Sequence, residues 1–327
     1  MKRIVLSTSI VGLLVSFLMI SCKKTSDTSS PSITDETALQ ATVSQNSTDQ
    51  FDLQNDDDAI ASDATSAAEL TPGFGMYSTS PSTGYTTLGV TDTLYIDSTS
   101  LPGIWLDRRA FKFGHPLLVL WYKGGHDAAG YIKQGKITVE IINGKKWTTA
   151  GAILKETDSI TITRGGKTRI YIGTRYVTNV SGGSLHTLTP NPFIYTMHAY
   201  HTVTFDNGTQ RTYWIARRNT FNKQTYTFTT TGDTTIYNNL CTIGGKTRFG
   251  NDFLVQSPQP IISNLSCGFA NPTSGIRIHT STSNNQVVTI TFGVDANGTQ
   301  VTSGCALGYK INWLKLNGKQ GIAIIQY

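Results

Sequence analysis

Residues 159–172 read SITITRGGKTRIYI. Isoleucine alternates with serine or threonine over residues 159–163, which is the two-residue period of a strand with one buried and one exposed face. Gly165 and Gly166 then supply the positive φ angles that a tight hairpin turn needs, and strand-forming residues resume at Ile170. The stretch therefore predicts a β-hairpin, the unit from which we expect the body of the chain to be built.

The same alternation recurs along most of the chain after Gly73, for example over residues 287–292. Turn signals separate the runs, among them Asn-Gly pairs that begin at Asn143, Asn207, Asn297 and Asn317. No run after Gly73 has a convincing helical period. We therefore expect an all-β fold of antiparallel, hairpin-rich sheets, arranged either as a sandwich or as an extended β meander.

We divide this body into a first β region, residues 73–190, and a second, residues 191–327, and leave open whether the two form one continuous domain. Thr-rich strands followed by Asn-Gly-Thr-Gln occur at residues 202–210 and again at 289–300. Two interpretations stay open: a duplicated β module, or a chance likeness between Thr-rich hairpins. The last segment, residues 321–327, is expected to be a core strand.

At the N-terminus, Lys2 and Arg3 precede an uncharged run over residues 4–20. This order is that of a secretory signal peptide, which we assign to residues 1–21. The string MISC around the cleavage point resembles a bacterial lipobox, whose cysteine, here Cys22, is acylated. The run is at the short limit for a transmembrane helix, and the cysteine favours lipidation. We expect a lipid-anchored protein of the cell outer membrane, on either its periplasmic or its surface side.

Residues 22–72 form an acidic, Ser/Thr-rich tether. From residue 23 to 72 the formal charge is −8, and from residue 73 onward it is +12, although the whole chain carries only +6. Residues 23–47 are expected to be a flexible spacer. Residues 49–70 could be helical, because Ile60, Ala64, Ala67 and Ala68 follow a helical period. An acidic tether carrying a basic body suggests either simple solubility or a body that meets anionic polymers.

Four cysteines are present, of which lipid claims Cys22. We expect at most one disulfide in this oxidising compartment and favour Cys267–Cys305, which leaves Cys241 as a free thiol. The absence of a Cys-x-x-Cys pair or a Cys/His cluster argues against structural zinc, so no metal or other cofactor is predicted.

Three sequence patterns resemble catalytic or ligand-binding motifs but lack the features that the chemistry requires. The strings Gly-Gly-Lys-Thr at residues 165–168 and 244–247 lack the first glycine of a phosphate loop, so we interpret them as hairpin turns. His198 and His201 are three apart on an expected strand, so they would point to opposite faces and could not share a metal ion. The chain also contains no Gly-x-Ser-x-Gly string.

One surface stands out as a candidate binding face. Basic and aromatic residues alternate on two expected strands, at Lys167, Arg169, Tyr171, Arg175, Arg211, Tyr213 and Arg217. Ile170, Ile172 and Tyr176 would then face the core. Tyrosine rings and guanidinium groups together suit sugars with anionic groups or single-stranded nucleic acid, and we favour an anionic polysaccharide over nucleic acid. The alternative is an ordinary solvated sheet face.

An enzymatic alternative is an envelope glycan hydrolase with an unrecognised carboxylate pair. The body contains only two glutamates, Glu140 and Glu156, and we expect Glu156 and Asp158 to lie in a turn. Because no motif indicates such a pair, no catalytic residue is assigned and we favour a protein that is not an enzyme.

Several strings together resemble uncharacterised lipoproteins of the Bacteroidota: KK (23–24) after the lipobox, DDD (56–58), KW (146–147), TNVSGG (178–183), FDNGTQRT (205–212) and RFG (248–250). The resemblance covers most of the mature chain but implies no known activity or site. It also implies possible O-glycosylation at Asp-Ser/Thr strings, which begin here at Asp92, Asp97, Asp158 and Asp233. The lysines after Cys22 depart from the acidic surface-export signal of that phylum. The sequence thus predicts an envelope lipoprotein with a structural or binding role.

Overall fold

The computed structural model describes residues 33–69, 71, 93–96, 104–112, 115–126, 130–184, 189–233, 241–268, 271–281, 286–314 and 320–327. The expected signal peptide, the lipidation site at Cys22 and the Asn317-Gly318 turn lie outside the described residues. The chain divides into two compact units, residues 1–42 and residues 43–327. The second unit contains the whole sheet and most of the long helix.

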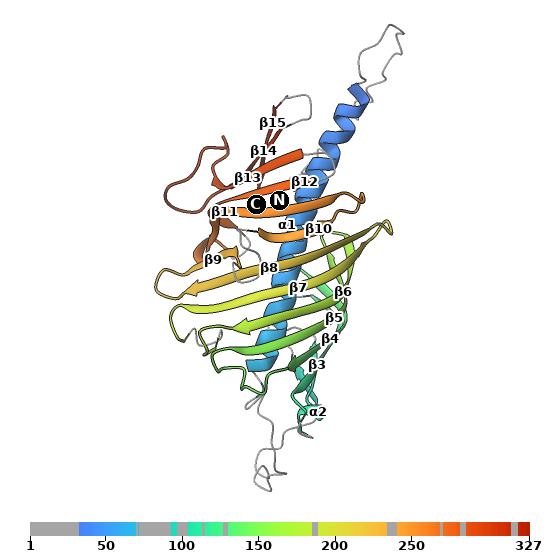
Figure 1. Ribbon diagram of the computed structural model, residues 1–327, viewed down its shortest axis with the longest axis vertical. Helices are drawn as coiled ribbons and strands as arrows, with labels where there is room; N and C mark the ends of the chain where they lie inside the picture. The colour runs from blue at the N-terminus through green and yellow to red at the C-terminus, as the bar shows by residue number, and fades with distance from the viewer. Residues whose placement is uncertain are drawn as a thin grey trace, which may run out of the picture. The chain divides into compact units, whose positions relative to one another are not determined.

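Over the described residues the sheet has fifteen strands, and each described pairing between neighbours is antiparallel (Figure 1). The strands are β1 Thr93–Ile96, β2 Ile104–Asp107, β3 Leu117–His126, β4 Ile132–Ile141, β5 Ala152–Arg164, β6 Lys167–Asn179, β7 Phe193–Phe205, β8 Gln210–Asn222, β9 Thr227–Gly232, β10 Cys241–Lys246, β11 Asp252–Asn264, β12 Pro272–Ser281, β13 Gln286–Val294, β14 Gly308–Leu314 and β15 Gln320–Gln326. The helices are α1 Ile33–Glu69, the short α2 Arg109–Lys112 and the 3-10 turn η1 Leu265–Cys267.

Strand order follows the chain from β1 to β15, except that β9 pairs with both β8 and β11 beside β10. The all-β prediction is confirmed, and the arrangement is the extended meander rather than the sandwich. Across the boundary expected near residue 190, β6 and β7 pair from Arg169–Phe205 to Asn179–Tyr195. The two expected β regions therefore belong to one continuous sheet.

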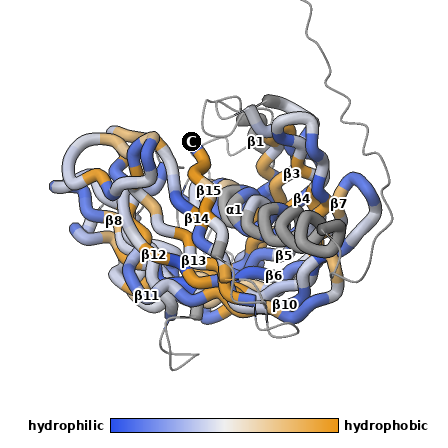
Figure 2. Tube along the Cα trace, turned by 90° about the horizontal axis from the view of Figure 1, so that it is seen from above, coloured by the Kyte–Doolittle hydropathy of each residue, from blue (hydrophilic) through white to orange (hydrophobic). Residues whose placement is uncertain are grey.

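Local sequence explains the hairpins. Arg164 pairs with Lys167, so β5 and β6 are joined by the two residues Gly165 and Gly166, with φ of 55° and 74°. Only glycine adopts such angles without steric cost, which is why this turn can be so short. Hydrophobic and hydrophilic residues alternate along the strands of the sheet, as expected for strands with two different environments (Figure 2).

The helix α1 is longer than the sequence predicts, because it begins at Ile33, inside the segment expected to be a flexible spacer. From residue 45 onward, the described buried side chains of α1 pack on one face of the sheet, which we call the inner face; the opposite side is the outer face. Leu53, Ile60 and the buried alanines of α1 share a hydrophobic core with inner-face residues such as Leu120 and Ile137. Among the described residues, no helix is long and apolar enough to cross a membrane.

At the C-terminal end of the sheet, a second hydrophobic cluster is formed by β11, β13 and β14. Here Cys267 and Cys305 form a disulfide, which is the pairing favoured from sequence. The side chain of Cys241 lies outside the described part of the chain. The final strand, β15, is half in the core: Ala323 and Ile325 pack on the cluster, whereas Ile322 is 66% exposed.

Candidate functional site: an inner sheet face bound to an acidic helix

The structure brings six of the seven predicted binding-face residues together on the inner face, but it buries them. Their side chains come from β6 and β8, and each is at most 5% exposed: Arg169, Tyr171, Arg175, Arg211, Tyr213 and Arg217. The seventh, Lys167, is exposed beside the β5–β6 turn. The predicted alternation is therefore present and places these side chains on one face of the sheet. This face is covered by α1.

The sidedness expected from sequence is wrong. Ile170 and Ile172, predicted to face the core, lie on the outer face and are 42% and 59% exposed. Tyr176 shares this outer face and is half-buried. The physical reason is that carboxylates of α1 form ion pairs with the arginines of β6. These arginines can therefore be buried, and the isoleucines beside them are left on the exposed face.

The first group of contacts joins β6 to the middle of α1. Arg169 forms ion pairs with Asp52 and with Asp56, the latter at 2.9 Å between Nη1 and Oδ2. The hydroxyl of Tyr171 donates a hydrogen bond to the same Asp56 oxygen at 2.5 Å. Asp56 is completely buried, so its charge depends on these two partners.

A second group centres on Arg175. Its guanidinium donates to Asp57 Oδ1 and to Glu156 Oε1, both at 2.7 Å, and Asp158 Oδ2 lies 3.7 Å away. Tyr213 donates to the other oxygen of Asp57 at 2.9 Å. Three carboxylates from α1 and β5 thus surround one arginine beneath the helix.

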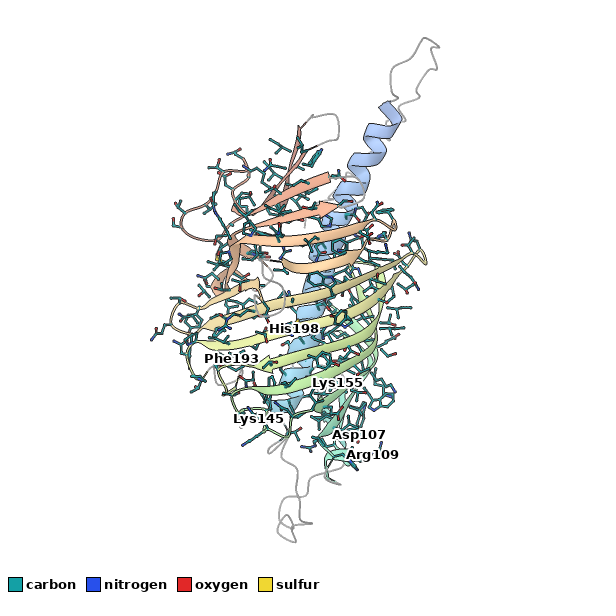
Figure 3. The ribbon with its side chains drawn as sticks, viewed as in Figure 1. Asp107, Arg109, Lys145, Lys155, Phe193 and His198 are labelled. Atoms are coloured by element: carbon teal, nitrogen blue, oxygen red, sulfur yellow. A yellow bond between two sulfur atoms is a disulfide. The ribbon has the colours of Figure 1, made fainter. Side chains whose placement is uncertain are left out.

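His201 on β7 completes this group, with Nε2 2.6 Å from Asp158 and Nδ1 3.4 Å from Asp57. His198 lies on the opposite face, where its Nε2 is 2.7 Å from Asp233 (Figure 3). The two histidines therefore contact different carboxylates. Among the described residues, no group of three or more His, Cys, Asp or Glu side chains is arranged to hold a metal ion.

Further pairs extend along the helix. Arg217 binds Asp58 at 2.7 Å, and Arg211 binds the side-chain oxygen of Gln50. Sequence reasoning missed three partners: Arg248 donates through Nε to Asp49 at 2.7 Å, while Lys133 and Tyr122 contact Asp63 at 2.7 and 2.8 Å. The sequence does carry a pattern that indicates Lys133 and Tyr122. Each residue falls, at the two-residue period of a strand, on the same face as the buried aliphatic residues of its strand.

Burial shifts the ionisation of this network. Desolvation raises the pKa of Asp56 to about 6, although Arg169 and Tyr171 act in the opposite direction. Burial likewise raises the pKa of Asp58 against the effect of Arg217. The pKa values of Tyr171 and Tyr213 are raised well above their usual range by burial and neighbouring carboxylates, so both remain hydrogen-bond donors.

The sequence prediction that Glu156 and Asp158 lie in a turn is wrong, because both residues lie on β5. Burial raises the pKa of Glu156 well above its usual range; Asp158 is also desolvated, but the charges of Arg175 and His201 hold its pKa below the usual range. Such a split is typical of an acid and base pair. Both side chains are at most 1% exposed beneath α1, so in this state they contact Arg175 and cannot meet a substrate.

Comparison with protein-family models, curated proteins and solved structures finds no match for this chain.

We expect Asp56→Asn to change how stability depends on pH. Because the folded-state pKa is about 6 against a reference of 3.8, the native state binds the proton more tightly, and stability is lost as pH rises from about 4 to 6. The loss amounts to about 3 kcal/mol for that shift. Urea unfolding at several pH values should show a shallower slope in Asp56→Asn. The control Asp206→Asn changes an exposed aspartate and should keep the slope of the wild type. If Asp56→Asn also kept that slope, the result would contradict this assignment.

We expect Arg175→Leu to destabilise the protein strongly, because it leaves buried carboxylates on α1 and β5 without a counter-charge. Removal of one partner from a buried ion pair costs roughly 3–5 kcal/mol. Arg218→Leu is a matched control, because this half-buried arginine on the same strand as Arg217 points to the outer face; we expect a change within about 0.5 kcal/mol. Urea denaturation followed by circular dichroism measures both, and equal effects would refute the central role of Arg175.

Proposed function

We propose that this chain is a lipid-anchored protein of the cell outer membrane with a structural or binding role, and that it is not an enzyme. The signal and lipobox pattern ending at Cys22 supports the anchor, and the resemblance to uncharacterised lipoproteins of the Bacteroidota supports the compartment. One observation carries the role: the basic and aromatic inner face holds a series of carboxylates that belong to the chain's own acidic segment.

The structural part of the proposal is that α1 fastens the sheet to the membrane-linked segment. An acidic helix and a basic sheet attract each other at long range, and their buried pairs allow few alternative registers. The part of the acidic tether that forms α1 is then packed on the sheet and is not a flexible connection to it. The sheet is bound to the segment that follows the lipidated cysteine.

The binding part of the proposal is that the inner face recognises regularly spaced carboxylates. The geometry used for α1 suits any polymer that presents carboxylates at similar intervals, because arginine and tyrosine donate directed hydrogen bonds to them. An anionic polysaccharide of this kind would have to compete with α1. Nucleic acid is not proposed as a partner.

A glycan hydrolase that uses Glu156 and Asp158 is the weaker candidate. Their separated pKa values favour it, but access would require α1 to leave and would also remove Asp57 from the network. We therefore propose that the pair serves to balance the charge of Arg175.

The lipid anchor is tested by Cys22→Ser. We expect this variant to lose membrane attachment and to enter the soluble envelope fraction, because acyl chains supply the binding free energy. The matched control is Cys241→Ser, which should remain in the membrane fraction. Cell fractionation followed by immunoblotting measures both, and a Cys22→Ser protein that stays membrane-bound would remove the anchor from the proposal.

The binding role is tested by the triple variant Asp52→Asn, Asp56→Asn and Asp57→Asn. We expect faster hydrogen exchange in α1 and binding of polygalacturonate that weakens with added salt, whereas the wild type binds little because α1 occupies the face. The matched control changes three aspartates away from α1, namely Asp206, Asp252 and Asp295, to asparagine. Faster exchange in α1 without polygalacturonate binding would leave only the structural role.

A further inference from the structure

The outer face of the sheet has a hollow of about 400 Å³ over β6, β7 and β8 and the adjoining β10. Two rows of side chains run along its sides. Ile172, Thr202 and Thr212 lie opposite one another in the first row, and Tyr200 and Trp214 lie opposite each other in the second. The hollow therefore runs across the strands, and not along them.

Backbone forms the floor of this hollow. Between the two rows lie Gly173 and Gly245, which have no side chain, and His201 and Tyr213, whose side chains belong to the other side of the sheet. The side chains of His201 and Tyr213 are buried against α1, so these residues contribute main-chain atoms to the hollow. The hollow is thus separated from the inner face by the thickness of the sheet.

Trp214 lies over the neighbouring strand β10. Gly244 is directly opposite Trp214, and a Cβ atom placed on this glycine would come within 2.4 Å of the indole. Gly244 is buried although it belongs to the outer face, because the ring covers it. The missing side chain lets the indole lie close to the sheet, and the half-buried Trp214 also lines the hollow.

The chemistry of the two rows is uncharged. In the second row Tyr200 is 61% exposed; in the first row Ile172 is 59% exposed, and Thr202 and Thr212 beside it add hydroxyl groups. A hollow over four neighbouring strands spans roughly 14 Å, at about 4.8 Å per strand. Aromatic surfaces beside hydroxyl donors and acceptors suit pyranose rings, whose C–H faces stack on aromatic groups while their hydroxyls form hydrogen bonds.

We propose that this hollow is a binding site for a neutral oligosaccharide, with Trp214 and Tyr200 as stacking residues and Thr202 and Thr212 as polar contacts. An anionic chain would find no counter-charge among the lining residues. The site goes beyond the proposed function, because it lies on the other side of the sheet and does not require α1 to move.

Isothermal titration calorimetry on the full-length lipidated chain in detergent tests this proposal. The probes are cellohexaose, xylohexaose, mannohexaose and maltohexaose, with polygalacturonate as the anionic comparison. We expect at least one neutral hexasaccharide to bind, with an affinity that added salt leaves unchanged. Salt-insensitive binding also separates this site from the inner face, whose ligands are anionic.

Three variants locate the site. Trp214→Ala should weaken hexasaccharide binding at least tenfold, and Gly244→Ala should weaken it severalfold with the indole still present, because the added methyl group lifts the ring. Phe249→Ala is the control, since this aromatic residue is 46% exposed on the turn after β10 and lies outside the hollow. Circular dichroism confirms that each variant is folded.

Three results would overturn the proposal. The first is that none of the four neutral hexasaccharides binds. The second is that binding is unchanged in folded Trp214→Ala and Gly244→Ala. The third is that polygalacturonate binds more tightly than every neutral probe.

Discussion

Buried pairs between carboxylates of α1 and guanidinium groups of the sheet hold the described part of the molecule in one arrangement. Each buried ion loses several kcal/mol of hydration, so the pairs themselves add little net stability. The apolar residues of α1, such as Leu53 and Ile60, supply hydrophobic burial against the same face. The ion pairs then decide which side of α1 meets the sheet and in which register, because any other register would leave a buried charge such as Arg175 without its carboxylates.

This constraint explains the uneven charge of the chain. The acidic residues of α1 between Asp49 and Asp63 and the basic inner face of the sheet are complementary surfaces, and much of the charge that could attract a polymer is used internally. The alternation of side chains along a strand separates two chemistries: charged residues of β6 and β8 meet α1, while the uncharged side chains of Tyr200 and Trp214 line a hollow on the outer face. One sheet therefore presents two independent surfaces.

Local signals predicted the hairpins well, because a turn such as Gly165-Gly166 and the alternation beside it depend only on neighbouring residues. The same signals failed for the side of burial. The alternation on β6 separates Arg169 from Ile170 but does not say which of them is covered, and hydrophobicity alone chose Ile170 incorrectly. Glu156 and Asp158 were placed in a turn for a similar reason, since charged residues are rarely buried unless a partner from elsewhere neutralises them.

By itself, the sequence determined the all-β, antiparallel hairpin class, the composition of the candidate binding face and the favoured cysteine pair, because period, turn residues and residue chemistry are local properties; it left the choice between a sandwich and an extended meander open. Only the tertiary structure decided that α1 covers this face, that Asp56 and Asp57 are partners of Arg169 and Arg175, and that Trp214 lies over Gly244. These contacts join residues far apart in the chain. Their free energy depends on the exclusion of water, which exists only once the sheet and the helix have come together.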